Sequence, residues 1–378
     1  MRSIIYAPPT PSPAAPSPSS ARSRRIRNWA ATAPIPLLLI AVILAPGAAS
    51  QAAGTPSVLI SDAAIAKLPT SGAAWTSLKK YADSDDGTAD IADQDSNNDV
   101  HTLAEALVFA RTRVESYRTR AIANLKAAVG TEKGGRSLAL ARNLSGYVIA
   151  ADLVDLRLAA PDFDANTFRP WLRSTLSEVM SDGKTLRQID EQRPNNWGTH
   201  AGAARAAVSV YLGMGSELAR TAQVFKGWLG DRSAYAGFKY GDLSWQANPN
   251  APVGIDASGT ETYAAGSDIP LGGALPEEMR RGGTLQWPAL YTGYPWEALQ
   301  GATLQAEILG HAGYDSWSWS NQALARAAKY LTNTLKWPAI GDDTWQPWLI
   351  DARTNASIPL PSSTKPGKNF GFTDWLYG

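Results

Sequence analysis

The chain has 378 residues, enough for one large domain or two ordinary ones, and a net charge of +1. Its 35 basic and 34 acidic residues are almost balanced and form no basic stripe, which argues against binding to nucleic acid. Cysteine is absent, which excludes a disulfide framework and a thiolate metal site. The 14 Trp and 13 Tyr favour a carbohydrate ligand, because aromatic rings stack on sugars.

The N-terminal region has the order of a secretory signal peptide. Arginines between positions 22 and 27 precede an apolar run from Trp29 to Leu44, and small residues follow from Pro46 to Ala53. The run is short and contains two prolines, so we expect no stable membrane insertion, although an uncleaved anchor remains the alternative. We therefore predict a leader with signal peptide over residues 1–53, a mature domain over residues 54–378, and a secreted protein, extracellular or periplasmic.

The rest of the chain has the periodicity of short helices. Apolar residues recur at spacings of three and four, as at Leu144, Val148 and Ala151, and the alternation typical of strands is nearly absent. We expect an all-α fold with paired antiparallel helices. The predicted helices are 62–68, 71–83, 101–113, 115–129, 135–156, 165–180, 199–212, 214–227, 297–311 and 320–336. The stretches 230–296 and 337–378 read as long irregular segments, which in compact domains are usually functional.

An acidic loop, Asp83 to Asp99, alternates oxygen ligands in the manner of a calcium loop. It lacks the central glycine of such a loop, and Glu105 falls one residue beyond the position of the bidentate ligand. We therefore interpret this loop as part of a cleft and as a helix cap before His101. No metal and no cofactor are expected in the functional site.

A second polar motif opens the helix predicted at 199–212. Asn195, Asn196, Trp197, Thr199 and His200 supply amides, an indole, a hydroxyl and an imidazole, and the helix that follows is rich in small residues. Two asparagines before a helix are often only a cap, and a lone histidine is often structural. This set of neutral hydrogen-bonding groups nevertheless suits a site for a sugar carboxylate better than a metal site.

The motif Asn195-Asn196-Trp197-Gly198-Thr199-His200, followed by Leu275-Pro276-Glu277-Glu278-Met279-Arg280-Arg281 and an aromatic-rich run, resembles the alginate lyase superfamily of helical polysaccharide lyases. The resemblance covers residues 58–375. It implies an incomplete (α/α) toroid of helical hairpins around a deep cleft. It also implies β-elimination on a uronic-acid polymer of the alginate, polymannuronate or glucuronan type, with an anionic polysaccharide as the partner and a monomeric enzyme.

The resemblance assigns roles to particular residues. Asn196 matches the residue that neutralises the substrate carboxylate, and Arg280 or Arg281 matches the family arginine. His200 is the candidate base, and a tyrosine is the alternative. Tyr291 or Tyr294 would perform the remaining proton transfer, because the family tyrosine falls near Trp287.

The sequence departs from the family at two places. Trp197 stands where the closest members have histidine, and Trp287 cannot exchange protons. These departures favour a branch that acts on another uronate polymer, such as glucuronan. The side chains predicted to contact the substrate are Asn195, Trp197, His101, Asn98, Arg142 and Trp287.

Two other classes of function stay open. A glycoside hydrolase on the same toroid would need two carboxylates across the cleft, and Asp256, Glu261, Glu277 and Glu278 are available. A non-catalytic secreted carbohydrate-binding protein would account for both departures. The unsaturated uronide that only a lyase produces distinguishes the three classes.

Overall fold

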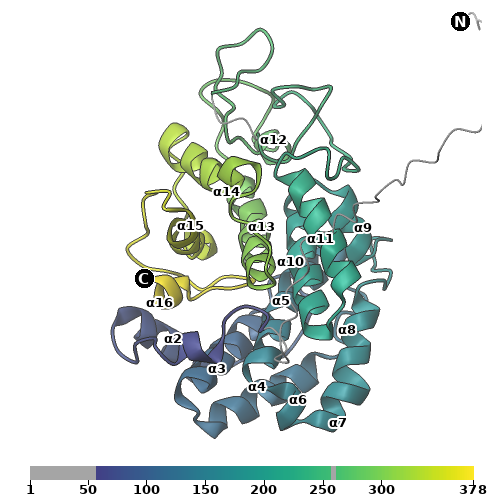
Figure 1. Ribbon diagram of the computed structural model, residues 1–378, viewed down its shortest axis with the longest axis vertical. Helices are drawn as coiled ribbons and strands as arrows, with labels where there is room; N and C mark the ends of the chain where they lie inside the picture. Colours follow the sequence, from purple (N-terminus) through teal and green to yellow (C-terminus); the bar gives the residue numbers. More distant parts are fainter. Residues whose placement is uncertain (1–56, 257–260) are drawn as a thin grey trace, which may run out of the picture. The chain divides into compact units, whose positions relative to one another are not determined.

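The computed structural model describes residues 57–256 and 261–378, which belong to a compact unit spanning Gly54–Gly378 (Figure 1). The predicted leader and signal peptide lie outside the described residues. Within these residues no strand forms, and a single antiparallel bridge joins Tyr263 and Pro270. The all-α prediction is confirmed.

The helices are numbered in chain order, and short 3₁₀ or π-helical turns are labelled η. They are α1 Asp62–Ile65, α2 Ala73–Asp83, α3 Asn98–Thr112, α4 Glu115–Ala128, α5 Ser137–Leu153, α6 Leu156–Ala159, α7 Pro161–Phe163, η1 Asp164–Phe168, α8 Arg169–Thr175, α9 Leu186–Gln192, α10 Asn196–Leu212, α11 Gly215–Trp228, α12 Pro276–Met279, α13 Tyr294–His311, α14 Trp319–Lys329, η2 Tyr330–Thr334, η3 Gly341–Asp343, α15 Gln346–Thr354 and α16 Thr373–Tyr377.

Most helix predictions agree with these bounds, and the differences have local causes. Ser61 caps α1 by accepting a hydrogen bond from the backbone of Ala64. The helix predicted at 165–180 is instead a π-helical turn followed by α8, which ends at Thr175. The expectation of an irregular tail was wrong for two stretches, because α15 and α16 form within residues 337–378. The short helix α9 was not predicted.

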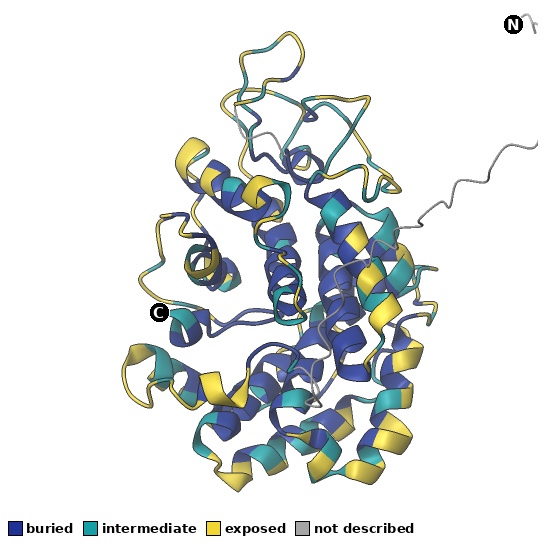
Figure 2. Cartoon of the chain, in the orientation of Figure 1, coloured by how far each residue is buried: buried dark blue, intermediate teal, exposed yellow. Residues whose placement is uncertain are grey.

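Helix α10 lies at the centre of the helical packing, in contact with α5, α9, α11 and α13. Almost all of its side chains are buried, as Figure 2 shows by its dark blue colour. Glycine permits the close approach of α13, since a Cβ atom on Gly301 would lie 2.4 Å from the backbone nitrogen of His200. This glycine of α13 therefore lets α13 pack against the start of α10.

Consecutive helices also pack against one another. Contacts join α2 with α3, α3 with α4, α4 with α5, α9 with α10 and α10 with α11. Tryptophans fill much of the apolar core, and Trp245, Trp345 and Trp375 are at most 2 % exposed. The buried ring of Trp245 is therefore not available to stack on a sugar.

A buried ion network fixes α9, α10 and α11 to one another. The guanidinium of Arg205, on α10, lies 2.8 Å from Asp190, 3.0 Å from Glu191 and 2.6 Å from Glu217. The side chain of Arg205 is 3 % exposed, so each of its contacts forms away from water. This network holds the outer face of α10 and leaves the opposite face toward α5 and α13.

Candidate functional site

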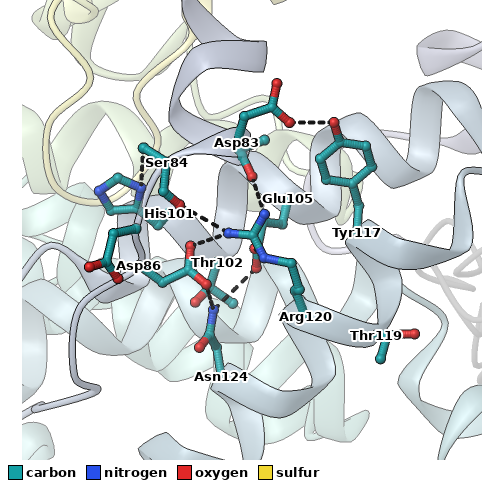
Figure 3. Close-up of polar contacts among 12 residues, drawn as sticks. Asp83, Ser84, Asp86, His101, Thr102, Glu105, Tyr117, Thr119, Arg120 and Asn124 are labelled. Carbon is teal, nitrogen blue, oxygen red and sulfur yellow. Dashed lines mark hydrogen bonds and ion pairs between the residues drawn. The ribbon is translucent and has the colours of Figure 1, made fainter.

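The acidic segment before α3 is tied to the protein by Arg120 of α4. Its guanidinium lies 2.7 Å from a carboxylate oxygen of Asp86, 2.7 Å from Glu105, and donates to the backbone carbonyls of Ala82 and Ser84 (Figure 3). Asn124 bridges Asp86 and Glu105. Among residues 57–256 and 261–378, no group of three or more His, Asp or Glu side chains gathers in a way that would hold a metal ion.

Two predicted contact residues, Asn98 and His101, begin α3. The side-chain amide of Asn98 donates to the backbone carbonyls of Asp86 and Gly87, and its oxygen accepts from Tyr147 at 2.7 Å. Both polar atoms of the Asn98 side chain therefore form hydrogen bonds within the protein. The Nδ1 atom of His101 lies 3.0 Å from the carbonyl of Tyr81, and the two rings lie 5.4 Å apart.

A cavity of about 370 Å³ adjoins His101. It is lined by the acidic segment, by helices α2, α3 and α5, by η3 and by the segment before α16. The charged residues that line it are Asp95, Arg142, Asp342, Lys365 and Lys368.

Arg142, predicted from sequence as a substrate contact, reaches this cavity from α5. Its guanidinium lies 3.8 Å from Glu297 and 3.8 Å from Asp342, and its side chain is 13 % exposed. It makes no hydrogen bond to any described residue, and its Nε atom is a buried donor without a partner there. The guanidinium of Arg142 therefore has no hydrogen-bond partner among the described residues, and it borders the cavity.

The segment before α16 was missed by the sequence analysis, yet it supplies two buried polar groups. The ammonium of Lys368 lies 2.8 Å from Asp99 and 2.6 Å from the amide oxygen of Asn143. The next residue, Asn369, contacts His200 across 2.9 Å between its Nδ2 atom and the imidazole Nδ1. No local sequence signal marks these residues, because their partners lie far away in the chain.

His200 is fully buried in α10. Burial, together with the positive charge of Arg142, lowers the pKa of His200 to about 3. Its imidazole is therefore neutral near pH 7, with an Nε2 atom that has no hydrogen-bond partner among the described residues. An unperturbed imidazole, with a pKa of about 6.5, would suit a base near neutral pH, and burial moves His200 away from that value.

Asn196 is the first residue of α10 and is 5 % exposed. Its side chain makes no hydrogen bond within the described residues, and its Oδ1 atom is buried without a partner. Its backbone N–H donates to the carboxyl of Glu278, which burial keeps at a raised pKa of about 8. Asn195 ends the preceding loop, but its side chain does not cap α10.

Arg280 and Arg281, at the end of the Leu275–Arg281 motif, point to different partners. Arg280 pairs with Glu277 and lies beside Gly241, in the irregular segment. Arg281 turns toward α10 and α13: its guanidinium lies 3.7 Å from Glu278 and 3.2 Å from the ring centre of Tyr294. Arg281, and not Arg280, is therefore connected to Asn196 through Glu278.

The remaining predicted residues are more exposed and lie apart from this chain of contacts. Tyr291 is 55 % exposed and its ring meets Trp337 edge-on at 5.2 Å. Trp287 is 45 % exposed. Trp197, half-buried, lies 4.4 Å from the guanidinium of Arg193, which occupies one face of its ring.

The structure thus connects Asn196, His200, Arg142, Arg281 and Tyr294. Glu297 completes the set: it lies one turn after Tyr294 on α13, and its Oε2 atom is a buried acceptor without a hydrogen bond to the described residues. The sequence analysis did not select Glu297, since a single glutamate on an apolar helix carries no motif.

No protein-family model matches the chain, and a search of curated proteins finds no match. No helix of the described residues is both long enough and apolar enough to cross a membrane.

Proposed function

We propose that this protein is a polysaccharide lyase that cleaves a uronic-acid polymer by β-elimination. One observation carries the proposal: the buried carboxamide of Asn196 is unpaired, and it lies one helical turn from a neutral imidazole, His200. A preorganised amide without an internal partner is what a site needs to stabilise charge on a substrate.

The first chemical requirement of β-elimination is neutralisation of the substrate carboxylate, which makes the C5 proton acidic. Arg142 supplies a cation without a hydrogen bond to the described residues, and the amide of Asn196 supplies a neutral donor. A carboxylate held by these two groups would delocalise the negative charge that develops as the C5–H bond breaks.

The second requirement is proton transfer. The hydroxyl of Tyr294 makes no hydrogen bond to the residues that the structure describes, and the guanidinium of Arg281 packs on its ring. We assign the C5 proton to Tyr294, which takes it as the phenolate, while His200 contributes a neutral hydrogen bond. The C4–O4 bond breaks as the C4=C5 double bond forms, and the departing oxygen takes a proton from Tyr294.

An incomplete (α/α) toroid is part of the proposal. Its support is the packing of consecutive helices against one another, from α2 to α5 and from α9 to α11. Export, a monomeric state and an anionic polysaccharide as partner remain predictions that belong with it.

The experiment is incubation of the protein with polymannuronate, polyguluronate and glucuronan, followed by ultraviolet absorbance of the conjugated C4=C5 double bond. A lyase raises this absorbance in step with new reducing ends. Reducing ends that appear without the absorbance contradict the proposal, and binding without either product identifies a non-catalytic protein.

A glycoside hydrolase is the second candidate, and one feature favours it. Glu297 and Asp342 flank Arg142, each 3.8 Å away, so two carboxyl groups lie beside this guanidinium. Burial raises the pKa of Glu297, against the lowering effect of Arg142, as a general acid requires. Of the four carboxylates available for this role from sequence, Glu277 and Glu278 are instead held by arginines and by the start of α10.

A further inference from the structure

Two neighbouring cavities differ sharply in charge. The cavity of about 370 Å³ beside Arg142 shares Asn97 and His101 with a second cavity of about 450 Å³. The two spaces therefore meet at the start of α3. The first is the one that adjoins the proposed reaction centre, through Arg142.

The first cavity can hold anions. Arg142, Lys365 and Lys368 line it, together with two carboxylates. Lys365 is exposed and forms no ion pair with the described part of the chain, so its ammonium is available to a ligand. Tyr81 and His101 add ring surfaces to the same wall.

The second cavity would repel anions. Asp85, Asp86, Asp90 and Asp93 line it, and no lysine or arginine does. Asp86 is compensated by Arg120 at 2.7 Å (Figure 3), whereas the three others form no ion pair with any residue of 57–256 or 261–378. Their Oδ1 atoms accept backbone hydrogen bonds within turns, which holds the carboxylates in place.

We propose that the cavity beside Arg142 binds the terminal uronate of the polymer and that the acidic cavity ends the binding groove. Every unit of a polyuronate carries a negative charge, so a chain continuing past His101 would place a carboxylate against the aspartates. The polymer is then cut from one end. This inference rests on the proposed function, and it adds the mode of action to it.

The test compares two readouts on polymannuronate and glucuronan: absorbance of the unsaturated product and viscosity. Cutting from an end raises the absorbance while viscosity falls slowly, and the first products are short. A rapid fall in viscosity, with long internal fragments, overturns the inference and leaves lyase activity intact. Absence of the unsaturated product overturns the proposed function itself, so the two failures are distinguishable.

Charge variants test the acidic barrier. Asp90→Asn with Asp93→Asn keeps the side-chain oxygens that accept the turn hydrogen bonds and removes two negative charges. We expect longer initial products from this variant. The matched control is Asp162→Asn with Asp268→Asn, at two exposed aspartates outside both cavities, which should leave the product lengths unchanged. An unchanged product pattern in the first variant contradicts the barrier.

Binding of a uronate disaccharide tests the cationic cavity without turnover. Lys365→Gln should weaken binding roughly two- to fivefold, the scale of one exposed charge, with a larger effect at low salt. Lys67→Gln, an exposed lysine elsewhere, is the control and should bind as the unmodified protein does. Equal affinities for both variants would place the terminal uronate outside this cavity.

Discussion

Asn369 holds the imidazole of His200 from a position 169 residues further along the chain, with 2.9 Å between Nδ2 of the amide and Nδ1 of the ring. This contact joins the segment before α16 to the start of α10. Among the described residues it is the hydrogen bond that the His200 ring makes, so the orientation of the imidazole depends on a segment without any recognisable motif.

The buried imidazole predicts a pH dependence of stability. The folded pKa of His200 is about 3, below the ordinary 6.5, so the unfolded chain binds more protons between these values. Stability from this group is therefore full above pH 6.5 and is lost as pH falls. The loss is about 2 kcal/mol at pH 5. Urea unfolding at pH 5 and pH 7 gives the free energy of unfolding of the protein and of His200→Asn. The difference between these two free energies should change by that amount between the two pH values. An equal difference at both pH values would contradict a buried neutral imidazole.

The carboxamide of Asn196 predicts a catalytic effect with little change in stability. Asn196→Ala should lower turnover on a uronate polymer at least a hundredfold, or about 3 kcal/mol, because a preorganised donor to the substrate carboxylate is lost. Its side chain makes no hydrogen bond to the described residues, so the unfolding midpoint should change little. The control is Asn166→Ala, at an exposed asparagine. Near-normal turnover of a folded Asn196→Ala protein would remove the proposed clamp.

The buried carboxyl of Glu278 predicts a dependence of stability on pH that is opposite in sign to that of His200. Burial raises its folded pKa to about 8, so the folded protein binds more protons between pH 4.5 and pH 8, and this contribution to stability falls as pH rises. Glu278→Gln removes the titration and can keep an oxygen for the backbone N–H of Asn196. Relative to the unmodified protein, the variant should gain about 3 kcal/mol between pH 5 and pH 8.

The neighbouring Glu277→Gln is the control for this measurement. Glu277 lies on the same short helix and pairs with Arg280, so Glu277→Gln removes a neighbouring carboxyl group while Glu278 stays in place. Unfolding of both variants in urea at several pH values gives the comparison. A Glu278→Gln protein whose relative stability stays constant with pH would show that Glu278 is ionised in the fold.

The ion network of Arg205 predicts a large structural effect. Arg205→Met should lower the free energy of unfolding by about 3–5 kcal/mol, because it leaves the buried carboxylate of Asp190 without its cation. Arg113→Met removes an exposed pair with Asp62 and should cost at most about 1 kcal/mol. Urea unfolding measures both. Similar losses for the two variants would show that burial does not decide the strength of these pairs.

The sequence by itself determined the helical class and most of the long helices. Apolar spacing carries this information locally, and the small residues of α10 already indicated close helix packing, which Gly301 of α13 completes. It also singled out Asn196, Arg142 and His200 as polar groups that needed a role. The weak points were short or mixed elements such as α9, where few residues repeat the pattern.

Only the tertiary structure decided which polar residues meet. Arg280 and Arg281 are adjacent in sequence, yet successive positions on a helical turn point in different directions, so one contacts Glu277 and the other packs on Tyr294. Lys368 and Asn369 enter the site through partners more than a hundred residues away. Burial likewise set the pKa of His200, because desolvation depends on the helices that surround a side chain and not on its neighbours in sequence.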